Sequence, residues 1–362
     1  MLLDFFPSPT LTWYLARTFV VRIAAVLVML VLVLLMLDLL STTGKIVAQP
    51  GNGQAEVLRY ASLRVPQLVA QFLPYSALLA TIITLSTFNQ NSEITAMKAA
   101  GMSAHQILAP LILAAAVIAA ISFAFNELVV TRATGTLSAW ERADFGPVPD
   151  DPDVRSNVYL NDGNDVLFAR TVAGTGAATV MRDVTFYERD AQGMIRRRIT
   201  APVARYADPG WRLEQPRVFE LGPATPRAVS GALVVAPGLT IGQVNLRRVD
   251  ADAEPLPQLA RSIAALKAAG SRTAELEGRW WHKISGPLSA VLMPLLGAVA
   301  GFGLARSGHL FARAVIGMAL GFAYFVVDNA ALAMGSFGSY PPVLAAWAPF
   351  VLFALVGEAV LT

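Results

Sequence analysis

Six long apolar segments, three before and three after a polar middle region, constrain the fold of this chain more than any other feature. A helix needs about 20 predominantly apolar residues to cross the hydrocarbon core of a bilayer. Segments of this kind lie at 13–39, 65–88, 104–125, 284–304, 310–334 and 342–361. They predict six transmembrane helices. The share of charged residues, 15% against about 25% in an average soluble domain, supports this interpretation.

Basic residues in the short loops predict the orientation, because such residues concentrate in cytoplasmic loops. The loops and ends that we expect in the cytoplasm carry Arg17, Arg22, Lys98, Arg306 and Arg313, and the loop at 335–341 carries no charge. Both termini are then cytoplasmic, and the 40–64 loop and the middle region lie on the periplasmic side of the inner membrane. Lys45, Arg59 and Arg64 in the 40–64 loop run against this rule.

The middle region alternates short apolar and polar runs that are broken by turn residues. Hairpins are predicted at 157–170 around Asp162-Gly163, at 183–199 around 191–193, and at 204–215 around 208–210. Repeated hairpins at this spacing are typical of an antiparallel sandwich or jelly roll. The expected fold class is therefore an α-helical membrane protein with an inserted all-β domain. Its parts are helices 1–3 in 1–129, a β-jelly-roll-like domain in 130–255, and a connecting helix with helices 4–6 in 256–362.

Motifs for catalysis or metal binding are absent from the sequence. The chain has no cysteine and no G-x-x-x-x-G-K-[ST] motif, so we expect neither a thiolate site nor ATP hydrolysis by a P-loop. His105, His282 and His309 all stand at predicted membrane boundaries, where interfacial solvation explains them better than a metal does. We therefore predict no catalytic, cofactor or metal site in this chain.

Polar residues within the apolar segments are costly and are often functional. Asp328-Asn329 lies inside the fifth segment, as either a substrate or gating contact or a buried pair with a neighbouring helix. Asp38 stands at the outer end of the first segment, where headgroups can solvate it. Asn126-Glu127 is predicted to end the third segment. Two G-x-x-x-G patterns, which start at 297 and 317, would allow close packing within the chain or with another subunit.

A short semi-polar stretch, SEITAMKAAGMS at 92–103, separates the second and third segments. Ser92 is a candidate N-cap, Glu93 favours the positive end of the helix dipole, and Gly101 can end the helix in a left-handed conformation. A helix of about two turns, at about 92–102, is predicted. It either rests on the bilayer or inserts into a cytoplasmic partner, as in the permease of an ABC transporter.

Four stretches give the chain a more specific resemblance. These are SEITAMKAAGMS (92–103), Asn126-Glu127, RWWHKISGPLS (279–289) and GFAYFVVDNA (321–330). Together with the order of three spans, a large domain and three spans, they resemble the LptF/LptG permease family of the bacterial lipopolysaccharide exporter over nearly the whole chain. The W-x-K-I-x-x-P pattern from Trp281 and the position of Asp328 are closer to LptG than to LptF.

The resemblance implies a subunit that extracts lipopolysaccharide from the inner membrane and passes it to a periplasmic bridge. The implied partners are an LptF-like permease, two LptB-like ATPases that hold ATP and magnesium, and LptC-like and LptA-like jelly-roll proteins. No nucleic acid is implied. The helix that would dock on the ATPase contributes Ser92, Glu93, Ile94, Met97, Lys98 and Gly101.

The first and fifth spans are expected to line a lipid cavity and form its lateral gate. The residues assigned to this cavity or gate are Leu34, Asp38, Lys45, Phe325 and Asp328. Family members often carry several lysines just beyond the position of Asp38, whereas here only Lys45 remains. We therefore expect the lipid phosphates to meet Lys45, Arg59, Arg64 or Arg132, and the acidic residues to pair with such cations or with divalent ions.

Other functions remain open from the sequence. The chain could be the LptF-type subunit or a permease for another lipid or lipoprotein. It could be an intramembrane lipid-modifying enzyme that uses Asp328 and a histidine, or an anchor whose β domain binds a periplasmic partner. A co-purifying ATPase would favour transport, and activity of the isolated chain on lipid would favour an enzyme.

Overall fold

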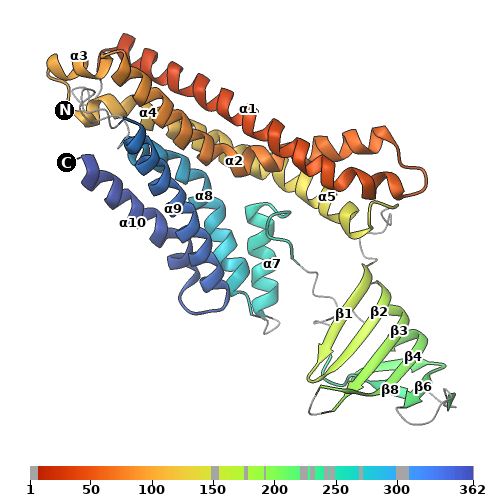
Figure 1. The fold of residues 1–362 in the computed structure, drawn as a ribbon. Coiled ribbons are helices and arrows are strands. Elements are labelled where there is room, and N and C mark those ends of the chain that lie inside the picture. The colour runs from red at the N-terminus through yellow and green to blue at the C-terminus, as the bar shows by residue number, and fades with distance from the viewer. Residues whose placement is uncertain are drawn as a thin grey trace. The chain divides into compact units, whose positions relative to one another are not determined.

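The computed structural model describes residues 7–147, 155–174, 178–190, 193–220, 227–228, 233–239, 244, 249–268, 272–298 and 310–361. The chain forms two compact units (Figure 1). A helical unit comprises Met1–Gly146 and Asp250–Thr362, and a sheet unit comprises Pro147–Val249. The sheet unit is thus an insertion within the helical unit.

The helical unit contains nine described α-helices and one π-helical turn. These are α1 (Pro9–Ala48), α2 (Gln54–Gln90), α3 (Glu93–Ala99), α4 (Ala104–Phe125), the π-helix η1 (Asn126–Val130), α5 (Thr131–Arg142), α7 (Leu256–Ala268), α8 (Ala274–Gly297), α9 (Leu310–Ser336) and α10 (Pro342–Leu361).

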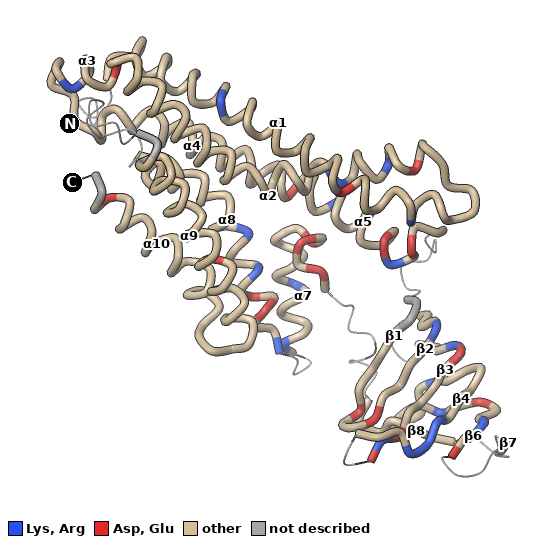
Figure 2. Tube along the Cα trace, viewed as in Figure 1, with Lys and Arg blue, Asp and Glu red and all other residues tan. Residues whose placement is uncertain are grey.

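Five helical segments in the described part of the chain are long and apolar enough to cross a membrane. They are Pro9–Ala48, Gln54–Gln90, Ala104–Arg142, Ala314–Ser336 and Pro342–Ala359. The predicted span at 284–304 falls partly on α8 and partly on residues outside the described ranges. In Figure 2, long stretches of α1, α9 and α10 carry no charged residue, as a hydrocarbon environment requires.

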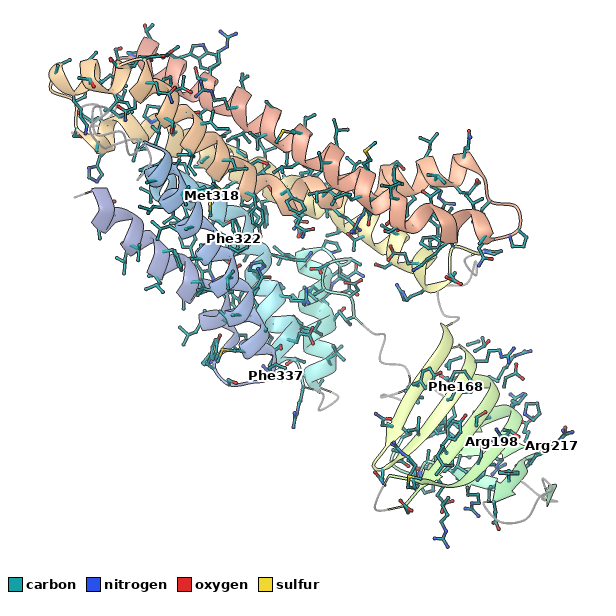
Figure 3. The ribbon with its side chains drawn as sticks, viewed as in Figure 1. Phe168, Arg198, Arg217, Met318, Phe322 and Phe337 are labelled. Carbon is teal, nitrogen blue, oxygen red and sulfur yellow. The ribbon has the colours of Figure 1, made fainter. Side chains whose placement is uncertain are left out.

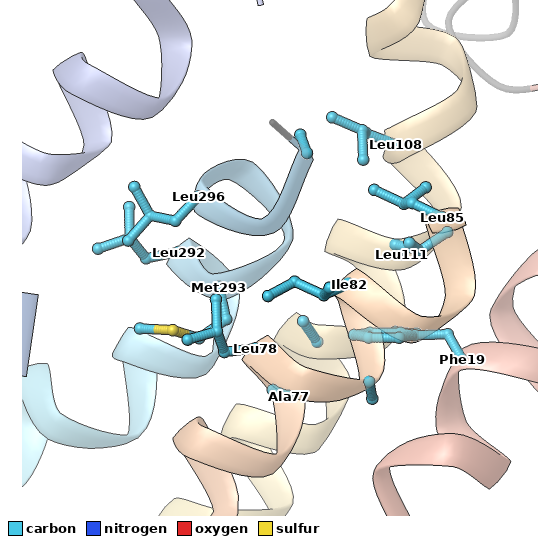
Figure 4. Packing of buried hydrophobic residues seen from close by; sticks show 14 of the residues in the cluster. Phe19, Ala77, Leu78, Ile82, Leu85, Leu108, Leu111, Leu292, Met293 and Leu296 are labelled. Atoms are coloured by element: carbon cyan, nitrogen blue, oxygen red, sulfur yellow. The ribbon is translucent and has the colours of Figure 1, made fainter. Parts of the chain in front are cut away.

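Helix α8 packs against α2, α4, α9 and α10 and holds the helical unit together. Leu292, Met293 and Leu296 of α8 belong to the same buried cluster as Leu78 and Ile82 of α2 (Figure 4). The helices approach closely because glycines stand at the contacts.

Two of the G-x-x-x-G glycines pack within this chain. A Cβ added to Gly297 would lie 2.7 Å from Thr81 Cγ2, and a Cβ added to Gly321 would collide with Leu78. A Cβ at Gly317 would make only ordinary contacts, the nearest at 3.6 Å from the Leu296 carbonyl oxygen. Gly301 lies outside the described residues.

The predicted 40–64 loop is wrong, because α1 and α2 extend through most of it and leave only a short connection at 49–53. These extensions are stabilised by a separate apolar cluster of Ile46, Tyr60, Leu137, Trp140 and Phe145. Residues 131–142, assigned above to the β domain, instead form α5 and supply Leu137 and Trp140 to this cluster. Asn126-Glu127 likewise does not end a helix, because η1 continues α4 into α5.

The sheet unit consists of eight described strands in one antiparallel sheet. The strands are β1 (Arg155–Asp162), β2 (Asp165–Ala173), β3 (Val180–Arg189), β4 (Ile195–Tyr206), β5 (Trp211–Glu214), β6 (Arg217–Glu220), β7 (Arg227–Ala228) and β8 (Leu233–Val235). Their order is β1-β2-β3-β4-β5-β8, with β6 between β4 and β7. All three predicted hairpins are confirmed by the pairs β1–β2, β3–β4 and β4–β5. Residues 191–192 of the second turn lie outside the described ranges.

A line of irregular positions crosses three strands of this sheet. Arg170, Asp183 and Pro202 are neighbours in the register, and Asp183 has a left-handed φ of +51°. The alternation of buried and exposed residues is interrupted here: in β4, Ile199 and Ala201 are buried two positions apart, but the next buried residue is Ala204, three positions on. Because side chains alternate along a regular strand, such an irregularity lets the strands bend while the same face stays on the core.

Candidate functional site

A cavity of about 930 Å³ lies within the helical unit. Its walls come from α2, α4, η1, α5, α8 and α9 and from the segment after the sheet unit, at 250–252. Of the residues that the sequence assigned to the lipid or its phosphates, Arg64, Phe325 and Asp328 line this cavity. The others do not line it; they are Leu34, Asp38, Lys45, Arg59 and Arg132.

Asp38 is held by two donors from α2. Asp38 Oδ2 accepts hydrogen bonds from the Tyr60 hydroxyl at 2.8 Å and from Arg64 Nε at 3.0 Å. Arg64 Nη1 also donates to Gln67 Oε1 at 2.7 Å, and Gln67 donates to Thr134 of α5 at 3.1 Å. This network joins three helices, so Asp38 is already compensated by a cation of its own chain.

The other predicted cations have different surroundings. The guanidinium of Arg59 lies 5.1 Å from the ring centroid of Trp140, which is a cation–π distance. Lys45 and Arg132 are exposed. None of these three side chains lines the cavity, and all three are exposed at the surface of the helical unit.

Asp328 forms a buried pair with a histidine of the neighbouring helix. His282 Nε2 lies 2.9 Å from Asp328 Oδ2, and Asp328 is only 5% exposed. One turn earlier on α9, Phe325 stacks on Tyr75 of α2 at a centroid distance of 3.7 Å. The interpretation of Asp328 as one half of a pair between helices is therefore supported, with His282 of α8 as the partner. The His282–Asp328 and Tyr75–Phe325 contacts hold α9 against α8 and α2, and all four residues line the cavity. Oδ1 of Asp328 is buried without a hydrogen-bond partner among the described residues.

Lys283 and Glu127 form a second buried pair, which the sequence did not predict. Lys283 Nζ lies 3.6 Å from Glu127 Oε1 and donates to the Glu254 carbonyl oxygen at 2.7 Å. Glu127 Oε2 accepts the backbone N–H of Leu256 at 2.7 Å, and Trp280 Nε1 donates to the Leu256 carbonyl oxygen at 3.2 Å. The pair thus fixes the segment by which the chain returns from the sheet unit.

A π-helical turn supplies Glu127 to this junction. Short π-helical segments inside α-helices are frequent at functional sites. The sequence named both residues of the pair, as parts of the stretches 126–127 and 279–289, but 156 positions separate them (283 minus 127). Nothing in a single sequence signals a contact over that distance.

Helix α3 has one face in the core and one face outside. Ile94 and Met97, two of the residues predicted to dock on an ATPase, are buried in the main helical cluster of this chain. Thr95, Lys98 and Ala99 are exposed on the other face. The helix is thereby attached to its own bundle, which explains how seven residues remain helical.

The ends of α3 depart in part from the prediction. Gly101 has φ +90°, and the bonds from Gly101 N to Lys98 O and from Met102 N to Met97 O form a Schellman motif, as expected. Ser92 occupies the N-cap position, but its φ is +60° and its side chain accepts no capping hydrogen bond. The prediction of a serine side-chain cap is therefore wrong, because the turn after α2 requires a left-handed residue at this position.

Glu93 binds within the chain. Its Oε2 accepts from the Tyr14 hydroxyl of α1 at 3.2 Å, and its Oε1 accepts from Asn91 Nδ2 at 3.2 Å. Near the start of α4, the helix that follows α3, His105 Nε2 lies 2.8 Å from Glu358 Oε1 of α10. Both acids therefore tie helices to one another near the two chain ends (Figure 1).

Comparison with known proteins gives one consistent result. The family described as "Lipopolysaccharide export system permease LptF/LptG" matches residues 13–362. The permease protein LptG of Escherichia coli strain K12 is 26% identical over 361 residues, which cover 97% of each chain. LptG of Haemophilus influenzae strain Rd is 25% identical over 305 residues, which cover 82% of this chain and 83% of the relative.

The Lys283–Glu127 pair yields a stability prediction. Replacing Lys283→Met leaves a buried carboxylate without its cation, which costs about 3–5 kcal/mol. The double variant Lys283→Met with Glu127→Gln should recover much of this loss, because the glutamine oxygen can still accept from Leu256 N. Thermal unfolding of the purified chain in detergent measures both effects.

The matched control is Lys267→Met, which removes the exposed 3.3 Å pair with Glu277 and should cost no more than about 1 kcal/mol. Equal destabilisation by the two single variants, or no recovery in the double variant, contradicts a structural role for the buried pair.

Proposed function

The chain belongs to the LptF/LptG family of lipopolysaccharide export system permeases, and from this membership we propose that its helical unit contacts lipopolysaccharide directly as the lipid leaves the inner membrane. It is a multi-pass inner-membrane permease and not itself an enzyme. The proposed subunit is of the LptG type, since the relatives named above are LptG proteins. The observation that carries the lipid contact is the cavity that Arg64, Phe325 and Asp328 line.

The surroundings of the cavity support lipid binding. Helices α1 and α9 expose apolar side chains such as Leu32, Met36 and Phe322 that suit acyl chains. Lys45 and Arg132 are exposed cations that suit phosphate groups, because an anion at headgroup depth needs a cation near it. The committed Asp38–Arg64 pair removes the repulsion that an anionic lipid would otherwise meet from Asp38, and Asp328 is held by His282 at 2.9 Å.

A photo-crosslinking amino acid tests this contact. We expect a crosslinker at Asn329, an exposed residue that lines the cavity, to give lipopolysaccharide adducts in cells. The matched control is Leu352, which is 53% exposed on α10 and does not line the cavity. Adducts are detected by their mobility and by antibody after purification of the chain. Equal adduct yields from both positions would mean that the crosslinks reflect only exposure to membrane lipid. The absence of an adduct at Asn329 would contradict the proposal.

A separate ATPase subunit is proposed to act on the outer face of α3. The chain has no P-loop of its own, and the exposed side of α3 carries Thr95, Lys98 and Ala99 beside the half-buried Glu93. Helix α3 is bound to the core through Ile94 and Met97, so a force on its outer face would reach the bundle.

Two substitutions separate ATPase contact from internal packing. Glu93→Ala should weaken ATPase association by about 1.5–3 kcal/mol, a loss of at least about tenfold, because a charge-assisted contact is removed. Tyr14→Phe deletes only the internal 3.2 Å hydrogen bond to Glu93 and should leave association unchanged. Co-purification with the ATPase measures both. If Tyr14→Phe weakens association as much as Glu93→Ala does, Glu93 acts through α1 rather than through the partner.

The remaining partners and the orientation are proposed from the family. An LptF-like permease would complete the cavity, and LptC-like and LptA-like proteins would receive the lipid from the exporter in the periplasm. The sheet unit is proposed to be periplasmic, with both chain ends and α3 in the cytoplasm. The charges of the short loops support this orientation.

Single cysteines test the orientation cleanly, because the chain has no cysteine of its own. In cells with a leaky outer membrane, a membrane-impermeant thiol reagent should label a cysteine at the exposed Arg196 of β4 and should not label one at Thr95 of α3. Both positions should react after the inner membrane is broken. The reverse pattern in intact cells inverts the topology.

A further inference from the structure

The outer face of the sheet unit presents two rows of residues that cross β1, β2, β3, β4 and β6. In the paired register, one row is Tyr159, Phe168, Thr185, Thr200 and Arg217, and the next is Asn161, Val166, Tyr187, Arg198 and Phe219. The alternating residues Leu167, Phe186 and Ile199 belong to the buried core, so the two rows point away from it. None of the ten residues is buried, and Tyr159 is 70% exposed.

This face combines aromatic rings with cations and carries no carboxylate in either row. The rings of Tyr159 and Phe168 are 4.7 Å apart, and the Arg198 guanidinium lies 5.6 Å from the Phe219 ring centroid. Phe168, Arg198 and Arg217 are labelled in Figure 3. The two arginines come from the adjacent strands β4 and β6.

The arginines of these rows are not neutralised by described residues of their own unit. Ion pairs in the described part of the sheet unit use Arg170, Arg197 and Arg205. The pair of Arg197 with Glu188 and Glu220 involves residues of the opposite alternation, on the core side of the strands. Beyond Glu220, the sequence contains no acidic residue before Asp250. The outer rows are therefore electropositive.

We propose that this outer sheet face binds the phosphorylated sugar headgroup of the exported lipopolysaccharide. Arginine binds phosphate through paired N–H donors, and Arg198 and Arg217 supply two such groups. Flat aromatic rings beside them offer an apolar surface for the C–H face of a sugar, with little loss of side-chain freedom. Thr185 and Thr200 lie between Phe168 and Arg217, and Asn161 stands at the β1 end of the second row; all three can exchange hydrogen bonds with sugar hydroxyls. Because arginines, hydroxyls and an amide stand among the rings of these rows, the polar headgroup is the part of the lipid that fits them better than an acyl chain does.

The inference rests on the proposed function, and two crosslinking positions in the full-length chain separate their failures. A photo-crosslinking phenylalanine derivative replaces Tyr159 in one chain and Asn329 in another, in cells that synthesise lipopolysaccharide. We expect lipopolysaccharide adducts from both positions. The double variant Arg198→Glu with Arg217→Glu should lower the Tyr159 adduct about tenfold, as expected for the loss of charge-assisted contacts, and leave the Asn329 adduct unchanged.

Two further variants guard against a general effect of charge or folding. Arg212→Glu makes the same charge change at an exposed position of β5, beyond the bend, and should leave the Tyr159 adduct unchanged. Arg198→Lys with Arg217→Lys keeps the charge and should retain most of the adduct. Thermal unfolding of each purified chain shows whether the sheet unit remains folded.

Each other outcome overturns the inference. Adducts at Asn329 without adducts at Tyr159 refute it and leave the proposed function standing. Protein adducts instead of lipid adducts at Tyr159 make the face a protein interface. A loss with Arg212→Glu as large as that of the double variant makes the effect nonspecific. Absence of adducts at both positions removes the inference and the proposed lipid contact together.

Discussion

Lys283 is only 7% exposed, and the groups that compensate its ammonium group join α8, η1 and the segment by which the chain returns to the helical unit. A buried charge requires both a counter-ion and hydrogen bonds. Glu127 supplies the negative charge, and the Glu254 carbonyl oxygen accepts a hydrogen bond from Lys283. The π-helical turn η1 and the segment around Glu254, which follows the sheet unit, must therefore both contact α8.

This meeting also explains why a sheet unit can be inserted at this point. The chain leaves the helical unit after α5 and returns at Asp250, whose Oδ2 accepts from Ser138 of α5 at 3.4 Å. Gly135 lies against Ala253, where an added Cβ would be 3.7 Å from the alanine Cβ. The two ends of the insertion are therefore joined within the helical unit.

The elements that local pattern determines were predicted well. Apolar runs placed five of the six predicted spans on helices, and turn residues placed all three hairpins. The helical extensions of α1 and α2 were missed because Gly44 and the polar residues around it resemble a loop. They are helical because Ile46 and Tyr60 pack against Trp140, a contact between segments far apart in the sequence. The pairs Lys283–Glu127 and His282–Asp328 were not predictable for the same reason.

Two buried or half-buried cations of the helical unit differ in their surroundings from two exposed ones. Arg64 and Lys283 are committed to internal partners and hold the walls of the cavity. Lys45 and Arg132 are exposed. A committed cation cannot bind a lipid phosphate without leaving its acid unpaired, which costs free energy. An anionic headgroup is therefore expected to bind at Lys45 or Arg132, while Arg64 and Lys283 keep their internal contacts.

Helix α1 contacts both α3 and Arg64, which lines the cavity. It is a single helix of 40 residues, with Tyr14 bound to Glu93 near one end and Asp38 bound to Arg64 near the other. At 1.5 Å per residue, the 24 residues between Tyr14 and Asp38 (38 minus 14) span about 36 Å. A rigid helix couples two sites when the contacts at its ends have two discrete arrangements. Both contacts are polar and partly accessible to solvent, whereas the buried side chains between them, such as Phe19 and Ile23, are fixed by close packing. If α3 couples to an ATPase as proposed, a movement of α3 would act on α1 through Tyr14 and would reach Arg64, at the wall of the cavity, through Asp38.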